Sequence, residues 1–128
     1  MQRLTAAKIK NLIVSVLKEH QALDIEALNV KKLTTITDYM IIATATSAAH
    51  AKALANYNHQ ALAALKIKPL GTEEDQTREW ILVDFGDVIL HIMLEPMRKF
   101  YALEKLWGTL KTRGDTISNP VIARSDGI

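Results

Sequence analysis

Residues 79–94 read EWILVDFGDVILHIML and contain two apolar segments separated by Phe85-Gly86. Short apolar runs bounded by turn residues are typical of buried strands, so we expect strands over residues 79–84 and 87–94. A glycine beside Asp87 favours a tight hairpin turn between them. The sequence therefore predicts an antiparallel hairpin in the second half of the chain.

Two further strands are expected upstream of this hairpin. Residues 38–44 form a nearly continuous apolar run, which is typical of a strand at the centre of a sheet. Residues 23–30 alternate more loosely between apolar and polar side chains and predict a shorter strand. Polar residues 34–37 form the turn that separates the two.

Helices are expected before, between and after these strands. Apolar residues at helical spacing predict a first helix from an N-cap at Thr5 to about Glu19. A second helix is expected from Ser47 to about Lys66, followed by a solvated loop through residues 69–75. Its buried side is predicted to contain Ala51, Leu54, Ala55, Leu62 and Leu65.

A third helix is predicted to start at Glu95-Pro96, where proline suits the first helical position, and to end at Gly108. We therefore expect one folded domain over residues 1–108 and a polar, flexible tail over residues 109–128. The order of elements predicts an α/β (α+β-like) fold with a mixed β-sheet and helices packed mainly on one face.

Composition limits the class of protein. The chain has 128 residues with 48% hydrophobic and 23% charged side chains, which fits one globular domain. It contains no cysteine, which excludes disulfides and thiolate metal sites. No signal peptide or membrane-spanning segment is expected, so we predict a cytoplasmic protein. A net charge of +2 with scattered basic residues does not favour binding to bare nucleic acid.

Asp84 and Asp87 are the most enzyme-like pair in the sequence. Two carboxylates three residues apart could hold a divalent cation, but aspartate is also favoured in turns for its local hydrogen bonds. We interpret both as turn residues; the alternative is a metal-dependent nucleotidyltransferase that uses Asp84 and Asp87. His50, His59 and His91 are interpreted as structural or interface residues, since the first two point in opposite directions from one helix.

Trp80 shares one face of its strand with Leu82 and Asp84, while Ile81 and Val83 share the other. If helices cover the Ile81 side, Trp80 lies either on an open sheet face, as an anchor for a protein partner, or under the tail or another strand. The sequence leaves both alternatives open.

The chain resembles the ribosomal silencing factor family (RsfS, also called Iojap). The resemblance rests on Thr37-Asp38-Tyr39, on residues 43–47 with His50, on residues 79–92, and on the closing residues Arg98, Phe100-Tyr101, Leu103-Glu104 and Leu106-Trp107. Family members usually have glycine where Ala45 stands. We expect this departure to cost little, since only a left-handed backbone would demand glycine.

The resemblance implies a nucleotidyltransferase-like fold without catalytic carboxylates, no enzymatic activity, no cofactor and no metal. It implies binding to the large ribosomal subunit through ribosomal protein fourteen, which blocks subunit joining and represses translation in starvation or stationary phase. It also implies a homodimer off the ribosome for some members and, for organelle relatives, a role in large-subunit assembly. No membrane contact and no direct sequence-specific nucleic acid binding are expected. The residues that we expect at the partner interface are Trp80, Asp84, Asp87, His91, Glu95, Arg98, Tyr101, Glu104 and Trp107.

Overall fold

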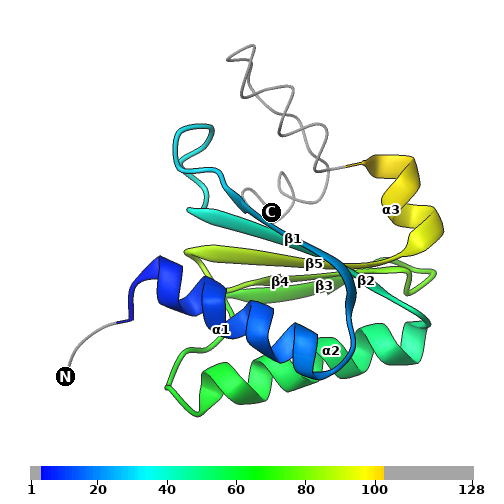
Figure 1. Cartoon of the computed structure of the whole chain (residues 1–128), viewed down its shortest axis with the longest axis horizontal. Helices are drawn as coiled ribbons and strands as arrows, with labels where there is room; N and C mark the ends of the chain where they lie inside the picture. Colours follow the sequence, from blue (N-terminus) through cyan, green and yellow to red (C-terminus); the bar gives the residue numbers. More distant parts are fainter. Residues whose placement is uncertain (1–3, 103–128) are drawn as a thin grey trace.

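The computed structural model describes residues 4–102. Eight elements follow one another in this part of the chain (Figure 1): α1 (Ala6–Glu19), β1 (Leu23–Asn29), β2 (Tyr39–Ala45), α2 (Ala48–Ala63), β3 (Gly71–Glu74), β4 (Trp80–Asp84), β5 (Val88–Leu94) and α3 (Glu95–Tyr101). Within residues 4–102, no helix is long and apolar enough to cross a membrane.

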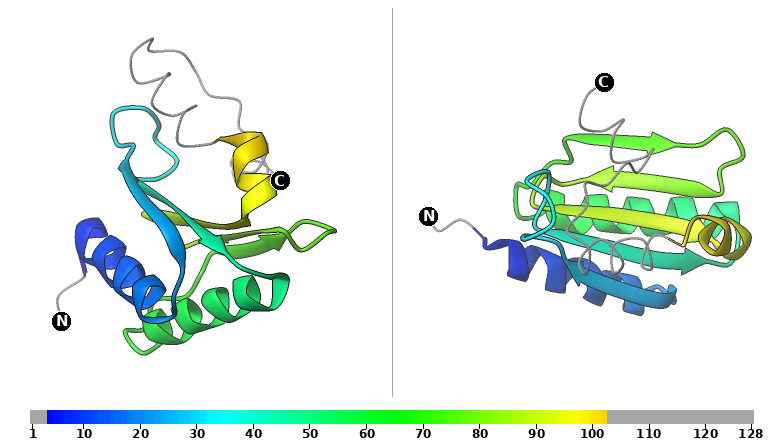
Figure 2. Two further views of the ribbon diagram at one scale, coloured as in Figure 1. Left: turned by 45° about the vertical axis from the view of Figure 1, so that its right-hand side comes forward. Right: turned by 90° about the horizontal axis from the view of Figure 1, so that it is seen from above.

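The five strands form one mixed sheet in the order β1-β2-β5-β4-β3, which Figure 2 shows from above. β2 and β5 run parallel at its centre, and the other three pairs are antiparallel. The predicted hairpin is confirmed as β4 and β5, with Leu82 opposite His91. The structure thus confirms a mixed α/β fold.

α1 and α2 cover one face of the sheet, and α3 and the loop between β1 and β2 lie on the other side (Figure 1). Ile81 and Val83 share one face, as predicted, and point into the helix-covered core together with Ile41 and Ile92. The periodicity of α1 explains this packing, because Ile13 and Leu17 lie on one stripe and are fully buried. Helices therefore pack mainly on one face.

Both predicted N-caps are confirmed, and α3 begins at Glu95-Pro96 as predicted. The Thr5 hydroxyl accepts a hydrogen bond from the Lys8 backbone N–H at 3.2 Å, and the Ser47 hydroxyl accepts one from His50 at 3.0 Å. These caps pair backbone donors that would otherwise have no partner in the first turn. Ala45 lies in β2 and is not among the residues with positive φ, so its place needs no glycine.

Three predictions about element boundaries were wrong. Residues 71–74 form the edge strand β3, not a loop, because their backbone pairs with β4. α2 ends at Ala63, and Lys66 takes a left-handed φ of 64°, which turns the chain so that Leu65 is exposed and not buried. α3 ends at Tyr101, where the left-handed Ala102 stops the helix before Gly108.

Candidate functional site

Trp80 and His91 form a buried pair on the face of the sheet opposite α1 and α2. Trp80 is 6% exposed, so it is covered and is not an exposed anchor; its cluster packs against Leu33 and Ile36 of the loop between β1 and β2 and against Met97 of α3. Its indole N–H donates a hydrogen bond to His91 Nδ1 at 3.0 Å, and the ring centroids lie 5.8 Å apart. The pair packs among Ile89 and Met93, the same-face neighbours of His91.

His91 is held in its neutral form. Burial lowers the pKa of its imidazole from 6.5 to about 3, because desolvation penalises the charged ring. An indole N–H only donates, so Nδ1 must accept and the imidazole proton lies on Nε2. Nε2 is buried and has no hydrogen-bond partner within the described residues. A neutral, enclosed His91 is therefore a structural partner of Trp80 and a poor proton acceptor.

Asp84 and Asp87 lie at the turn between β4 and β5. The Asp84 carboxylate accepts a hydrogen bond from the Gly86 N–H at 2.8 Å, and Gly86 has a φ of 90° that favours glycine. The Asp87 carbonyl accepts from the backbone N–H groups of Asp38 and Tyr39. The turn interpretation is confirmed for Asp84. In residues 4–102, no group of three or more His, Asp or Glu side chains could hold a metal ion.

Glu95 and Arg98 lie on α3, at the other end of β5. Arg98 is 9% exposed, and its Nη1 donates to the Thr44 hydroxyl at 2.8 Å and to the Asp24 carbonyl. Through these bonds Arg98 ties α3 to the ends of β1 and β2. Glu95 is exposed and pairs with Lys99 at 3.2 Å, one helical turn away.

A pocket of about 600 Å³ opens beside this link. Its lining consists of Asp24, Glu26, Thr44, Glu95, Arg98, Lys99 and Ala102. Asp24 and Glu26 are exposed on the edge strand β1. The pairing of β1 with β2 is irregular between Leu23 and Glu26, and Asp24 has a φ of 47°. Neither carboxylate was predicted from the sequence as a site residue, because a register shift in an edge strand leaves no periodic signal.

The predicted interface residues do not form one patch. Asp84 and Asp87 lie at one end of β5 and Glu95 at the other, and seven strand residues span roughly 20 Å. Glu104 and Trp107 lie outside the described residues, as does the side chain of Tyr101. Of the predicted residues whose side chains the structure describes, only Glu95 and Arg98 line the pocket.

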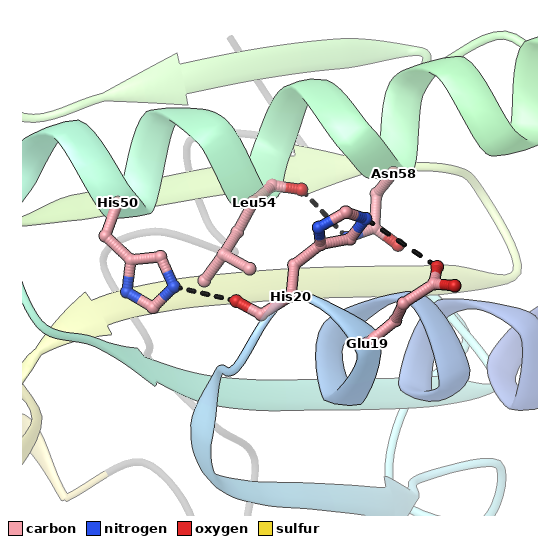
Figure 3. A network of polar contacts seen from close by, with 5 residues as sticks. All are labelled: Glu19, His20, His50, Leu54 and Asn58. Carbon is pink, nitrogen blue, oxygen red and sulfur yellow. Dashed lines mark hydrogen bonds and ion pairs between the residues drawn. The ribbon is translucent and has the colours of Figure 1, made fainter.

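The second histidine of interest, His50, joins the two long helices (Figure 3). Its Nδ1 accepts from the Thr46 N–H at 3.0 Å, so Nε2 carries the proton and donates to the His20 carbonyl at 3.0 Å. The His20 ring stacks on Tyr57 with centroids 3.6 Å apart. His50 therefore fastens the end of α1 to the start of α2, which supports its interpretation as a structural residue.

Comparison with known proteins identifies the family. A family model described as "Ribosomal silencing factor during starvation" matches residues 3–126. This chain belongs to the ribosomal silencing factor (RsfS/Iojap) family. The ribosomal silencing factor RsfS of Chromobacterium violaceum is 38% identical over 104 residues, which cover 81% of this chain and 85% of that protein.

This RsfS family member is also similar to a mouse protein and to a solved bacterial structure. It is 33% identical over 84% of its length to mouse mitochondrial assembly of ribosomal large subunit protein 1, of which it covers 48%. A crystal structure of a Chromobacterium violaceum protein matches with a TM-score of 0.79 and 37% identity, covering 82% of this chain and 88% of that one. The fold and the sequence thus agree on a ribosome-associated family.

Proposed function

We propose that this RsfS family member binds the large ribosomal subunit through ribosomal protein fourteen and sterically blocks docking of the small subunit. Translation is thereby repressed in starvation or stationary phase. The observation that carries the proposal is the family match over residues 3–126. Steric blocking needs affinity and bulk but no chemical step, so the proposed protein is a regulator and not an enzyme. Its proposed place of action is the cytoplasm.

The acidic surface around the pocket is the part of the described chain that we assign to the ribosomal protein. Asp24, Glu26 and Glu95 are exposed there, and neither Asp24 nor Glu26 forms an ion pair within residues 4–102. Complementary charge steers association and fixes the orientation of a complex. Basic side chains of ribosomal protein fourteen would meet these carboxylates. The buried Trp80 and His91 support the sheet behind this surface.

Subunit joining followed by light scattering tests the function. Purified small and large subunits are mixed at a Mg²⁺ concentration that favours joining, with increasing amounts of the protein. We expect a dose-dependent loss of the scattering increase. Normal joining at saturating protein, with the protein shown to be folded, would contradict the silencing function.

Charge reversal on the two edge strands tests the surface. Glu26→Lys on β1 is expected to weaken binding to isolated ribosomal protein fourteen about 10-fold or more, because it sets like charges against each other. Glu74→Lys is the matched control, since it makes the same charge change at an exposed glutamate on the opposite edge strand, β3. Equal effects of the two variants in calorimetry would show that the acidic surface is not the contact.

A second function, assistance in large-subunit assembly at the same binding site, is favoured by the name of the mouse relative. The two functions differ in timing. Sucrose-gradient profiles of cells lacking the protein would separate them. Assembly predicts that large-subunit precursors accumulate during growth, whereas silencing predicts normal precursors and excess joined ribosomes in stationary phase.

A further inference from the structure

Two lysines from different elements share one aromatic ring. The Lys10 ammonium of α1 lies 5.3 Å from the centroid of the Tyr39 ring, and that of Lys31, two residues past the end of β1, lies 5.4 Å from it. The electron-rich face of the ring attracts each ammonium group and helps to hold it in place. Neither lysine forms an ion pair in the part of the chain that the structure describes. Two positive charges that form no ion pair within the described residues are therefore held over one ring at the start of β2.

This end of the molecule is basic. The start of α1, the loop after β1 and the end of α2 all lie at this end, to the left in Figure 1. These segments carry Lys8, Lys10, Lys31, Lys32, Lys66 and Lys68, whereas the carboxylates at this end are Asp38, Asp84 and Asp87. None of these carboxylates pairs with a lysine within the described residues.

The opposite end of the sheet is acidic. Seven acidic residues lie at or near the ends of elements there: Glu19, Asp24, Glu26, Glu74, Asp75, Glu79 and Glu95. The cations at this end are fewer: Lys18, Lys52, Arg78, Arg98 and Lys99. The net charge of the chain is only +2, but basic and acidic side chains lie at opposite ends of the strands. A molecule with such a separation is oriented when it approaches a surface on which both signs of charge are displayed.

We propose that the basic end, with Lys10 and Lys31 at its centre, binds backbone phosphates of ribosomal RNA. The inference rests on the proposed binding to the large subunit and adds RNA as a second component of that contact. Lysine ammonium groups act as point-charge ligands for phosphate, and a phosphate between two lysines offsets their mutual repulsion. Contacts with phosphates orient a protein on RNA but do not recognise the base sequence. Lysines around a single aromatic ring are suited to contacts of this kind.

The test is the salt dependence of binding to purified large subunits. Lys10→Gln/Lys31→Gln is expected to weaken binding roughly 10- to 50-fold near 0.1 M salt. The slope of log affinity against log salt should fall by about 1.4–1.8, as the loss of two phosphate contacts requires. An unchanged affinity and slope, with thermal unfolding like that of the wild type, would overturn the inference.

Lys18→Gln/Lys52→Gln is the matched control. It removes the same charge from exposed lysines on α1 and α2 that lie away from Tyr39. We expect less than a twofold change in affinity and little change in slope. If both double variants weaken binding equally, the effect belongs to net charge, and the proposed site is wrong.

Isolated ribosomal protein fourteen distinguishes RNA from protein. Binding to it should be the same for the wild type and for Lys10→Gln/Lys31→Gln, and an equal loss there would assign the lysines to a protein contact and overturn the inference. If the wild type binds neither this protein nor the subunit, the proposed function fails first. Protein-free large-subunit RNA then serves as the probe. RNA binding that is weakened in Lys10→Gln/Lys31→Gln would support the inference. No RNA binding, or binding that is equal in the wild type and the variant, would overturn it.

Discussion

The two faces of the sheet are built in different ways. The face toward α1 and α2 is packed with Ile, Leu, Val and Ala side chains, and two long helices cover it. The other face contains the hydrogen-bonded Trp80–His91 pair and the flexible side chains of Met40 and Met93, with Met97 of α3 packed against them. The helix-covered face is thus specified mainly by apolar packing, with Asn58 of α2 as its fully buried polar residue. The other depends on a polar pair and on side chains that adapt to their neighbours.

The largest difference between the faces is expected from two isoleucines of β5. Ile92 belongs to the helix-covered core and Ile89 to the opposite cluster, and both are fully buried. Ile92→Ala should lower the free energy of unfolding by about 4 kcal/mol, because two helices and a sheet cannot collapse onto the cavity. Ile89→Ala should cost about 2–3 kcal/mol, because methionines can fill part of the space. Urea unfolding measures both.

This pair is its own control, since residue type, strand and burial are the same. An equal or larger loss for Ile89→Ala would mean that the opposite face is packed as rigidly as the helix-covered face. The comparison between a rigid and an adaptable face would then be wrong.

The second prediction concerns acid. Burial lowers the pKa of His91 to about 3, so between pH 6.5 and 3 the unfolded chain binds a proton that the folded protein excludes. Stability therefore falls as the pH falls, by about 1.4 kcal/mol per pH unit in this range, or about 3 kcal/mol between pH 7 and pH 4. His91→Gln has no such proton to exclude. Urea unfolding of both proteins at several pH values measures the difference in slope.

His91→Gln keeps an acceptor oxygen for the Trp80 N–H, so its stability at pH 7 serves as the reference. Parallel pH profiles for wild type and variant would show that His91 is not excluded from protonation. The polar pair would then be more open to solvent than its burial indicates.

The sequence predicted the helix-covered face well and the rest of the molecule less well. α1, β2, β4 and β5 have strong apolar patterns, and each was placed within a residue or two. That Ile81 and Val83 share one face follows from alternation, but the structure was needed to show that the helices cover this face. On that face, the residues that are buried are the ones that the helical and strand periodicities predict.

Elements whose conformation depends on a neighbour were missed. β3 has the sequence Gly-Thr-Glu-Glu, which lacks any strand pattern, and it is a strand because the backbone of β4 pairs with it from Glu74↔Ile81 to Gly71↔Asp84. The ends of α2 and α3 depend on left-handed backbone at Lys66 and Ala102, which neither residue type favours. The pocket depends on a register shift in β1 for the same reason: tertiary pairing overrides local preference.

The third prediction concerns the link on the less regular side of the sheet. Arg98→Met keeps an apolar stem but removes the guanidinium that bonds Thr44 and the Asp24 carbonyl. We expect a loss of about 2 kcal/mol in the free energy of unfolding, because buried hydrogen bonds to a charged group are worth more than average. Lys99→Met, at an exposed neighbour on the same helix, should cost less than about 0.5 kcal/mol. Similar losses for the two variants would mean that α3 is held by other contacts.

The smallest expected effect belongs to the corresponding link on the helix-covered side. His50→Ala removes the acceptor of the Thr46 N–H and the donor to the His20 carbonyl, so α1 and α2 lose their polar connection but keep their apolar contact. We expect a loss of about 1 kcal/mol, since the freed groups lie near the surface where water can replace the imidazole. Lys52→Ala, exposed two residues along the same helix, should be neutral within about 0.5 kcal/mol. Urea unfolding of these variants measures whether polar links or apolar packing stabilise the helix-covered side. A loss for His50→Ala as large as that for Arg98→Met would show that polar links matter equally on both faces, whereas a smaller loss assigns the stability of the helix-covered side to packing.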